Sequence, residues 1–385
     1  MVAYSELSAR HVAKPIRLAI VGVGNCASAL VQGLEYYRHA PRNGAPTRLG
    51  LMHERIGPFL PTDIEIVAAF DIDARKVGRP LGTAIAALPN CTTIFAAVSP
   101  AAGPTVNRGP TLDGVAPHMK RYPAAQRFSV SRAPACDVER VLRDARADVL
   151  VNYLPVGAQR AAEHYAACCL RAGVGLVNCI PVFIASDAVW ARRFAEAGVP
   201  LIGDDIKSQL GATIVHRMLT RLCAERGIHI ERMYQLNTGG NTDFLNMLDR
   251  SRLASKKRSK TESVQSQLRA PLPPDQIHIG PSDYVPWQKD NKVCFLRIEG
   301  RGFGGVPMHL ELRLSVEDSP NSAGVAIDAI RLVQVARHRG LAGPLIEASA
   351  YLMKHPPQQM PDEAARAALE AFIRRRARAK HLSIA

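Results

Sequence analysis

Hydrophobic residues in the first half of the chain fall into short β-branched runs separated by longer amphipathic stretches. The run at 16–21 is followed by a turn of small residues and then by a helical pattern at 28–37. Further strands are expected at 64–70, 149–153, 175–179 and 200–202, with helices at 136–145, 157–172 and 185–197. Strands that alternate with helices in this way are typical of a parallel α/β sheet.

The alternation ends near residue 207. We expect a helix at 213–226, a strand at 229–236, strand pairs around 292–299 and 308–315, and an apolar helix at 325–337 that returns to the first domain. This order predicts an inserted α+β domain with a mainly antiparallel sheet. We therefore expect one domain made of residues 1–206 and 320–385, interrupted by a second domain at 207–319.

Composition narrows the function classes. The 385 residues carry a formal net charge of +15, but aromatic residues are only 5% and no RNA-binding signature is present, so we expect no nucleic-acid partner. No apolar run reaches the roughly 18 to 20 residues that span a bilayer, and the amino terminus has no cleavage site. We expect a cytoplasmic protein without a membrane partner. The eight cysteines lack CxxC spacing and are expected to be reduced, buried thiols.

A glycine turn follows the first expected strand. Gly22 permits a tight turn, Gly24 allows close approach of a pyrophosphate, and Ala27 takes the third small position of a GxGxxG/A pattern. Asn25 and Cys26 would lie at the amino terminus of the next helix, whose N–H groups favour an anion. The motif is weak by itself because small residues also serve turns that bind nothing.

The second expected strand ends at Asp71, whose carboxylate would accept hydrogen bonds from ribose hydroxyls and favour NAD over NADP. An insertion at 39–61 lengthens the usual spacing of about 20 residues. Arg75 lies four residues further on, so a 2′-phosphate is not excluded. The irregular stretch at 82–134 is expected to run over the surface near the ligand cleft.

Polar side chains follow several of the later strands. The carboxyl ends of parallel strands meet at one edge of a sheet, so we expect Asn152, Asn178, Asp204 and Asp205 to converge there. Lys207 follows the Asp pair, which could orient it, and a lysine at this junction would stabilise an oxyanion or transfer a proton. The alternative is a strand-end turn with carboxylates that cap the next helix.

Two polar segments lie in the expected insertion. The loop at 237–243 offers amides and backbone N–H groups to sugar hydroxyls or phosphate, although a plain turn is the alternative. Lys256 and Lys260 are four residues apart and would share one face of a helix, where two ammonium groups suit a phosphate. An exposed basic run is the alternative there. Asp290 and Lys354 lie in segments that are ordinary when taken alone.

The combination is not ordinary. Seven segments occur in this order along nearly the whole chain: GVGNCAS, VNYLP, VNCIP, GDDIKSQ, LNTGGNTDFLNM, SKKRSKT and YLMKHPP. These segments resemble the myo-inositol-1-phosphate synthase family, in its shorter prokaryotic form, and GDDIKSQ with SKKRSKT is the most specific part of the match. The resemblance implies an NAD-binding Rossmann-like domain with an inserted α+β domain for catalysis and oligomerisation. It also implies a homotetramer that isomerises D-glucose 6-phosphate to 1D-myo-inositol 3-phosphate, also called 1L-myo-inositol 1-phosphate, without net oxidation.

The resemblance also implies a mechanism and residue roles. The open-chain sugar is oxidised at C5, an enolate at C6 attacks the C1 aldehyde, and the inosose is reduced again. Lys207, Lys260 and Lys354 are assigned to oxyanion stabilisation and proton transfer, Lys256 to phosphate or loop positioning, and Asp290 to orienting a lysine or the substrate. The residues expected to bind the cofactor are Gly22, Gly24, Asn25, Cys26, Ala27, Asp71, Asn152, Asn178 and Asp205. Those expected to bind the substrate are Ser208, Gln209, Asn237, Gly239, Gly240 and Asn241.

One feature departs from the family pattern. Eukaryotic members carry a second lysine shortly after the first, whereas this chain has no lysine between Lys207 and Lys256. Its phosphate contacts must therefore differ in part. Some members use a divalent metal or a monovalent cation, but no ligand set in the sequence establishes either.

Two other readings of the residues remain open. A different NAD(P)-dependent two-domain dehydrogenase would consume its cofactor, and a dinucleotide-sensing regulator would bind nucleic acid without turnover. The lysines at the domain junction favour catalysis over both. The long, charged stretch at 238–261 is expected to close over the substrate.

Overall fold

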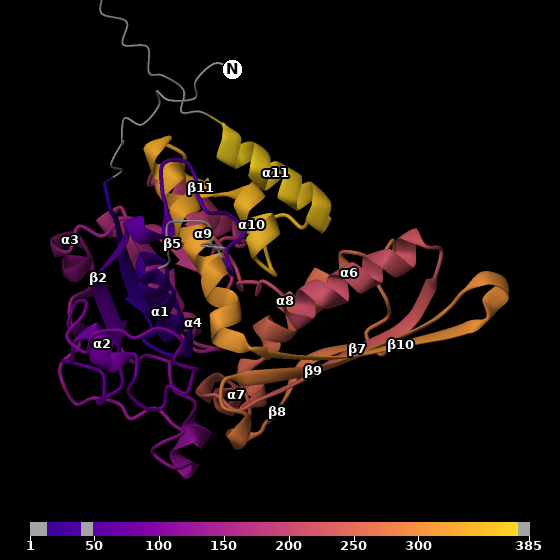
Figure 1. Cartoon of the computed structure of the whole chain (residues 1–385), viewed down its shortest axis with the longest axis horizontal. Coiled ribbons are helices and arrows are strands. Elements are labelled where there is room, and N and C mark those ends of the chain that lie inside the picture. The colour runs from indigo at the N-terminus through magenta and orange to yellow at the C-terminus, as the bar shows by residue number, and fades with distance from the viewer. Residues whose placement is uncertain (1–13, 40–48, 376–385) are drawn as a thin grey trace, which may run out of the picture.

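The computed structural model describes residues 14–39 and 49–375, without the side chains of residues 281 and 282. The amino terminus, on which the expectation of no export depends, lies outside these residues. The described chain forms two sheets with helices packed on them, and the second sheet projects from the first as a long arm (Figure 1). No helix in these ranges is both long and apolar enough to cross a membrane.

The first sheet has seven strands in the order β11-β6-β5-β4-β1-β2-β3, and its neighbouring strands are parallel. These strands are β1 (Ile16–Val21), β2 (Ile64–Asp71), β3 (Val106–Arg108), β4 (Val149–Asn152), β5 (Gly175–Asn178), β6 (Pro200–Ile202) and β11 (Gly343–Pro344). The order from β3 to β6 reads 3-2-1-4-5-6, which is the doubly wound arrangement of dinucleotide-binding domains. The predicted parallel α/β sheet is confirmed.

Helices cover both faces of this sheet. The packed helices are α1 (Asn25–His39), α3 (Val138–Asp144), α4 (Gln159–Ala172), α5 (Ala188–Glu196), α9 (Asp318–His338), α10 (Ile346–Leu352) and α11 (Asp362–Arg374). Ile16, Leu18 and Ile20 pack in the core with α1 and α9, whereas Ala19 and Val21 pack in the core with α3, α4 and α5. Burial on both sides explains why β1 is a continuous apolar run.

The stretch expected to be irregular at 82–134 holds more structure than predicted. It contains most of α2 (Leu81–Ala84) and all of β3, as well as the short 3-10 helix Pro117–Arg121. Three residues of β3 are too few to show a period of two, so this edge strand left no pattern in the sequence. The expectation that the stretch lies near the ligand cleft is confirmed, because Asn90, Thr111 and Phe128 line that cleft.

The second sheet has four strands in the order β10-β9-β7-β8. They are β7 (His229–Gly239), β8 (Ile277–Tyr284), β9 (Asn291–Arg301) and β10 (Pro307–Glu317). The β10-β9 and β9-β7 pairs are antiparallel and the β7-β8 pair is parallel, so the sheet is mixed. Helices α6 (Ala212–Glu225) and α8 (Ala254–Gln265) cover one face, and α7 (Thr242–Asn246) lies at the end nearest the first sheet (Figure 1).

Helix α9 joins the two sheets and begins earlier than predicted. It starts at Asp318, directly after β10, whereas the apolar pattern alone indicated 325. Pro320 falls in the first turn, where proline is tolerated because its missing N–H would have no partner there. The polar first turn of α9 thereby lies at the junction between the sheets, and its apolar remainder packs on α1 and β5.

Candidate active site

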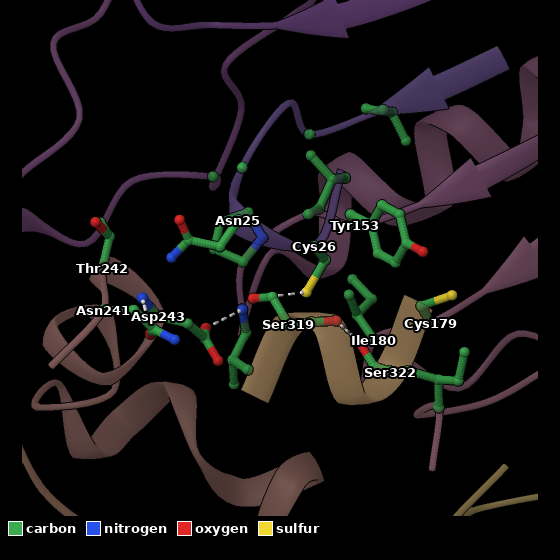
Figure 2. Close-up of a pocket in the computed structure, with 18 of the residues that line it drawn as sticks. Asn25, Cys26, Tyr153, Cys179, Ile180, Asn241, Thr242, Asp243, Ser319 and Ser322 are labelled. Carbon is green, nitrogen blue, oxygen red and sulfur yellow. Dashed lines mark hydrogen bonds between the residues drawn. The ribbon is translucent and has the colours of Figure 1, made fainter. Parts of the chain in front are cut away.

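A cleft lies at the carboxyl ends of β1, β4 and β5, where the first sheet meets the insertion. Figure 2 shows Asn25, Cys26 and Tyr153 on one side of this cleft, with Asn241, Ser319 and Ser322 across from them. The predicted site residues that line it are Gly22, Gly24, Asn25, Cys26, Asp71, Asp205, Ser208, Asn241, Lys256, Lys260 and Lys354. One cavity therefore joins the glycine turn to three of the predicted lysines.

The glycine turn has the shape that a dinucleotide requires. Gly22 has φ +88°, and a Cβ there would lie 2.5 Å from the carbonyl oxygen of Tyr153. Gly24 has open space on the side where a Cβ would stand. In the described chain the N–H groups of Gly24, Asn25 and Cys26 donate no hydrogen bond, so they can receive a pyrophosphate. Ala27 is buried in the core and does not line the cleft.

Asp71 lines the cleft, whereas Arg75 does not. The Asp71 carboxylate lines it and accepts hydrogen bonds from the N–H groups of Val23 (2.7 Å), Ile72 (2.7 Å) and Asp73 (2.8 Å). The Arg75 guanidinium is bound to the Asp73 carboxylate at 2.6 Å and to two backbone carbonyl oxygens. Arg75 is thus already used within the fold, and it is absent from the residues that line the cleft.

Three residues of the predicted strand-end cluster, Asn152, Asn178 and Asp204, lie beneath the cleft, whereas Asp205 lines it. The Asn152 amide donates to Asn178 at 2.9 Å, and the Asn178 amide donates to Asp204 at 2.7 Å. Asp204 also accepts from the N–H groups of Ile184 and Ser186. Complete burial raises the pKa of Asp204 to about 6, although these hydrogen bonds oppose the shift. Asn152 and Asn178 do not line the cavity and instead fix the strand ends that form its floor.

Four lysines from three separate segments surround the far end of the cleft, and we call Lys256, Lys260, Lys292 and Lys354 the lysine cluster. Lys256 and Lys260 share one face of α8, as their spacing predicted. Lys354 donates to the Asp205 carboxylate at 2.8 Å. The other carboxylate partners are Asp243, 3.1 Å from Lys256, and Asp318, 2.7 Å from Lys292.

Lys260 differs from the other three. Its side chain is 4% exposed, and it has no hydrogen bond or ion pair among the described residues. Burial lowers its pKa well below the ordinary value, and the neighbouring charges of Lys256 and Lys292 lower it further. Burial also lowers the pKa of Lys354, whereas Lys256 keeps a raised pKa because Asp243 and Asp205 outweigh its burial. The cleft therefore holds a buried amine whose charge the protein does not balance.

Lys207 lies outside the cleft. Its ammonium donates to the carbonyl oxygen of Ala350 at 3.0 Å and to Asp362 at 3.3 Å, and the side chain is 1% exposed. Burial and the charge of Arg217 lower the pKa of Lys207 to about 7. The expectation that the Asp pair orients Lys207 is wrong, because Asp204 binds Asn178 and Asp205 binds Lys354.

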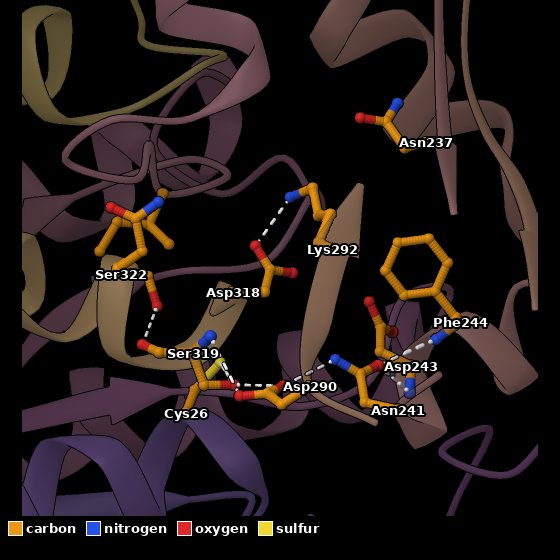
Figure 3. A network of polar contacts seen from close by, with 12 residues as sticks. Cys26, Asn237, Asn241, Asp243, Phe244, Asp290, Lys292, Asp318, Ser319 and Ser322 are labelled. Atoms are coloured by element: carbon orange, nitrogen blue, oxygen red, sulfur yellow. Dashed lines mark hydrogen bonds and ion pairs between the residues drawn. The ribbon is translucent and has the colours of Figure 1, made fainter. Parts of the chain in front are cut away.

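Asp290 lies behind the cleft in a polar network (Figure 3). It accepts from the Asn241 amide at 3.0 Å and from the Ser319 hydroxyl at 3.0 Å. Burial, with the nearby charge of Asp318, raises the pKa of Asp290 to about 6. Asp290 therefore orients Asn241 and the first turn of α9, both of which face the cleft.

The remaining predicted substrate residues are dispersed. The Gln209 amide donates to the carbonyl oxygen of Gly50, away from the cavity. Gly239 and Gly240 serve close packing, since a Cβ at Gly239 would meet Phe244 at 2.5 Å and one at Gly240 would meet the Val285 carbonyl oxygen at 2.4 Å. Asn237 lines a small pocket next to the main cleft.

Several functional candidates were missed from the sequence. Lys292, Asp318, Ser319 and Ser322 all line the cleft. Lys292 lies two residues after Asp290, in the same short polar segment. The family resemblance implied a role for Asp290 and none for Lys292. The other three belong to the first turn and a half of α9, which the apolar pattern placed too late. None of the eight cysteines is paired, as predicted, but only five are buried, and Cys26, Cys91 and Cys136 are partly exposed.

The described part of the chain offers no ready metal site. Among the described residues, no group of three or more His, Cys, Asp or Glu side chains is placed to hold a metal ion. Three carboxylates of the cleft, those of Asp205, Asp243 and Asp318, are each engaged by a lysine, and that of Asp71 accepts backbone N–H groups. The lysine cluster is therefore the main source of positive charge that the described residues contribute to this cleft.

Comparisons with known proteins agree with this geometry. Residues 211–319 match the family model described as myo-inositol-1-phosphate synthase. The chain is 54% identical to an inositol-3-phosphate synthase from Mycobacterium tuberculosis over 97% of this chain and 100% of that protein. It is 56% identical to one from Mycolicibacterium smegmatis over 93% of this chain and 98% of that protein.

A solved structure supports the fold. The myo-inositol-1-phosphate synthase-related protein from Thermotoga maritima has a TM-score of 0.73, at 23% identity, over 93% of this chain and 98% of that chain. The chain is more than 50% identical to both relatives over nearly their full length. The chain belongs to the inositol-3-phosphate synthase family.

Proposed function

We propose that this inositol-3-phosphate synthase uses NAD to convert D-glucose 6-phosphate to 1D-myo-inositol 3-phosphate in the cytoplasm, for inositol and inositol phospholipid synthesis. The main support for this proposal is that one cleft joins the glycine turn to the lysine cluster. A phosphorylated sugar that forms an enolate and then an alkoxide places negative charge at several positions in turn. Four ammonium groups around one cavity match that demand.

The glycine turn fits NAD. The close approach at Gly22, the open space at Gly24 and the unbonded N–H groups at the start of α1 suit a pyrophosphate. The Asp71 carboxylate lines the cleft where ribose hydroxyls would donate, and Arg75 is engaged elsewhere, which favours NAD over NADP. When bound, NAD supplies the acceptor and later the donor of hydride for the sugar.

The lysines divide the remaining work. Lys354, paired with Asp205, is placed to exchange a proton with the sugar chain, since a carboxylate 2.8 Å away fixes its orientation. Lys256 and Lys292 keep ion pairs with Asp243 and Asp318 and would act as fixed positive charges. Lys260 has no such partner and would receive the anionic substrate directly.

Lys207 is proposed as a positioning residue. The backbone N–H of Lys207 donates to Leu352, and Ile206 bridges Met353, so the segment of Lys207 pairs with the segment that carries Lys354. The Lys207 ammonium ties this pair to Asp362. Its loss would displace Lys354 in the cleft without removing a group that touches the sugar.

A homotetramer is also proposed. The face of the second sheet opposite α6 and α8 exposes Tyr234 (37%), Leu236 (36%) and Phe295 (43%). These three side chains lie side by side on β7 and β9, because Leu236 pairs with Phe295 and Tyr234 with Arg297. An apolar strip on a long open sheet face is the kind of surface that buries itself against another copy. Sedimentation equilibrium of the wild-type protein and of Phe295→Asp tests this assembly.

Turnover with catalytic NAD tests the function. The purified protein would be incubated with glucose 6-phosphate and a small amount of NAD, and inositol phosphate would be measured while absorbance follows NADH. Product without net NADH supports the internal redox cycle. Stoichiometric NADH would instead indicate the dehydrogenase, and salt-dependent binding of nucleic acid without product would indicate the regulator.

A further inference from the structure

Residues 110–128 leave the first sheet just after β3 and reach α7 of the insertion, and we call this segment the strap (Figure 1). Four residues of the strap line the nucleotide end of the cleft, namely Pro110, Thr111, Gly114 and Phe128. The strap begins beside the carboxylate expected to bind the ribose, because Arg108 at the end of β3 pairs with Asp71. A nucleotide bound along the cleft would therefore lie against the strap.

Both ends of the strap are fixed to the first domain. Near its start, the Asp113 carboxylate accepts hydrogen bonds from the N–H groups of Arg160 (2.8 Å) and Ala161 (3.0 Å) at the beginning of α4. Directly after its end, the N–H of Ser129 donates to the Asp73 carboxylate at 2.9 Å. The strap is thus held at both ends, while its middle crosses to the insertion.

The middle of the strap is joined to the insertion by a small apolar cluster. Met119 of the strap and Leu245 of α7 are both buried in this cluster. The rings of Tyr122 and Tyr284 meet edge to face beside them. The Nε2–H of His118 donates to the carbonyl oxygen of Leu245 at 2.8 Å. We call His118, Met119 and Leu245 the latch, because they connect the strap to the insertion.

The latch lies outside the cleft. None of its three residues lines the cavity, so their contacts can form whether or not a nucleotide is bound. A second hydrogen bond supports the same junction, since the Thr242 hydroxyl donates to the carbonyl oxygen of Gln126 at 3.1 Å. The strap is therefore held across the nucleotide end by contacts that the protein makes with itself.

We propose that the strap is a gate that retains NAD in the cleft, and that the latch keeps this gate shut. The adenosine half of the cofactor lies between Asp71 and the strap, and exchange requires the latch to separate. The inference rests on the proposed function, because a cofactor that takes hydride from the sugar and then returns it must stay in place between the two steps. A dehydrogenase that releases its cofactor after each turnover needs no such gate.

A gate and a direct binding contact have different effects on exchange. Loss of a contact with the nucleotide speeds release and raises the Kd. Loss of a latch that forms with and without nucleotide opens the strap more often in both states, so release and entry become faster by the same factor. The Kd then stays constant, because the change does not favour the free or the bound protein. The two rates together with the Kd therefore identify a gate.

His118→Ala removes the hydrogen bond of the latch and tests the proposal. Release is measured by loading the protein with radiolabelled NAD and adding an excess of unlabelled NAD. Calorimetry gives the Kd, and the ratio of the release rate to the Kd gives the rate of entry. The matched control is Lys120→Ala, which changes an exposed side chain in the same part of the strap.

We expect His118→Ala to release NAD about tenfold faster, as for a carbonyl that loses its partner, with a Kd that changes by less than about twofold. Lys120→Ala should change neither value. An unchanged release rate would overturn the proposal, and so would a Kd that rises as much as the release rate. If His118→Ala does not fold, Met119→Val reduces the packing of the latch and is judged by the same two values.

The same measurements separate the gate from the function. If the wild-type protein makes no inositol phosphate but His118→Ala exchanges NAD faster at an unchanged Kd, the function fails and the gate stands. If the wild-type protein makes product and His118→Ala exchanges NAD at the wild-type rate, the gate fails and the function stands. A wild-type protein that does not bind NAD would overturn both.

Discussion

The two ends of the cleft differ in how far the protein balances the charged groups that line them. At the nucleotide end, the Asp71 carboxylate accepts hydrogen bonds from three backbone N–H groups. Asn152 donates to Asn178, which in turn donates to Asp204. At the lysine end, four ammonium groups share three carboxylates and Lys260 has no partner in the described chain.

This difference indicates that the two ends bind their ligands in different ways. These side-chain hydrogen bonds hold the backbone of the nucleotide end in one shape before any ligand arrives. An excess of buried positive charge costs stability in the free protein and is offset only when an anion binds. We infer that the nucleotide end provides shape and the lysine end provides electrostatic stabilisation of charge that develops on the sugar.

Lys260→Met would remove the unbalanced charge and should have the largest effect. Turnover should fall on the order of 10³-fold, since a group that stabilises developing charge is lost, while the Kd for NAD stays unchanged. Product formation and NAD titration measure the two. Lys257→Met, three residues earlier and exposed, is the control and should retain activity.

The same variant should gain stability. The pKa of Lys260 is depressed in the folded protein, so holding its proton is unfavourable at low pH and the cost disappears as pH rises toward the unfolded value of about 10.4. Lys260→Met should therefore melt at a higher temperature than the wild-type protein, with a gap that narrows as pH rises. An equal melting temperature at pH 6 would show that the charge is already balanced.

Asp71→Asn would test the nucleotide end. Its amide cannot accept hydrogen bonds from Val23, Ile72 and Asp73 together as the carboxylate does, and the charge facing the ribose is lost. We expect the Kd for NAD to rise about tenfold to a hundredfold, measured by calorimetry. The affinity for inorganic phosphate at the lysine end should not change, and a parallel loss of both affinities would contradict the division of the cleft.

Asp290→Asn would test the network that links the two ends. The pKa of Asp290 is raised to about 6, so the folded protein binds more protons than the unfolded chain between pH 4 and 6, and this group lowers stability as pH rises through that window. The variant should remove on the order of 2 kcal/mol of that pH dependence. Urea unfolding of both proteins at pH 4.5 and 6.5 gives the difference, and equal pH slopes would exclude a titrating Asp290.

The sequence predicted the parts of the molecule that repeat a regular pattern. Strands such as β1 and β5 were recognisable because burial on both faces makes them continuous apolar runs. The shared face of Lys256 and Lys260 followed from helical spacing alone. The strand β3 was missed because three residues show no period.

The direction in which a side chain points was the least predictable feature. Lys207 and Lys354 lie in segments that pair with each other, yet Lys354 faces the cleft and Lys207 faces Asp362. That difference depends on α11, which lies 155 residues beyond Lys207 and carries the carboxylate that binds it. Lys292 and Asp318 were missed for a similar reason, because their meeting in the cleft depends on where β9 begins beside the start of α9.

Arg75→Ala should have the smallest effect and sharpens the choice of nucleotide. The Arg75 guanidinium binds Asp73 and the carbonyl oxygens of Ala124 and Arg127, and Arg75 does not line the cleft. If Arg75 does not contact the nucleotide, the ratio of the Kd values for NAD and NADP should change by less than about twofold, within the range of surface substitutions. A large loss of NADP affinity alone would mean that Arg75 leaves Asp73 to bind a 2′-phosphate, and that the nucleotide end is less completely satisfied than its hydrogen bonds indicate.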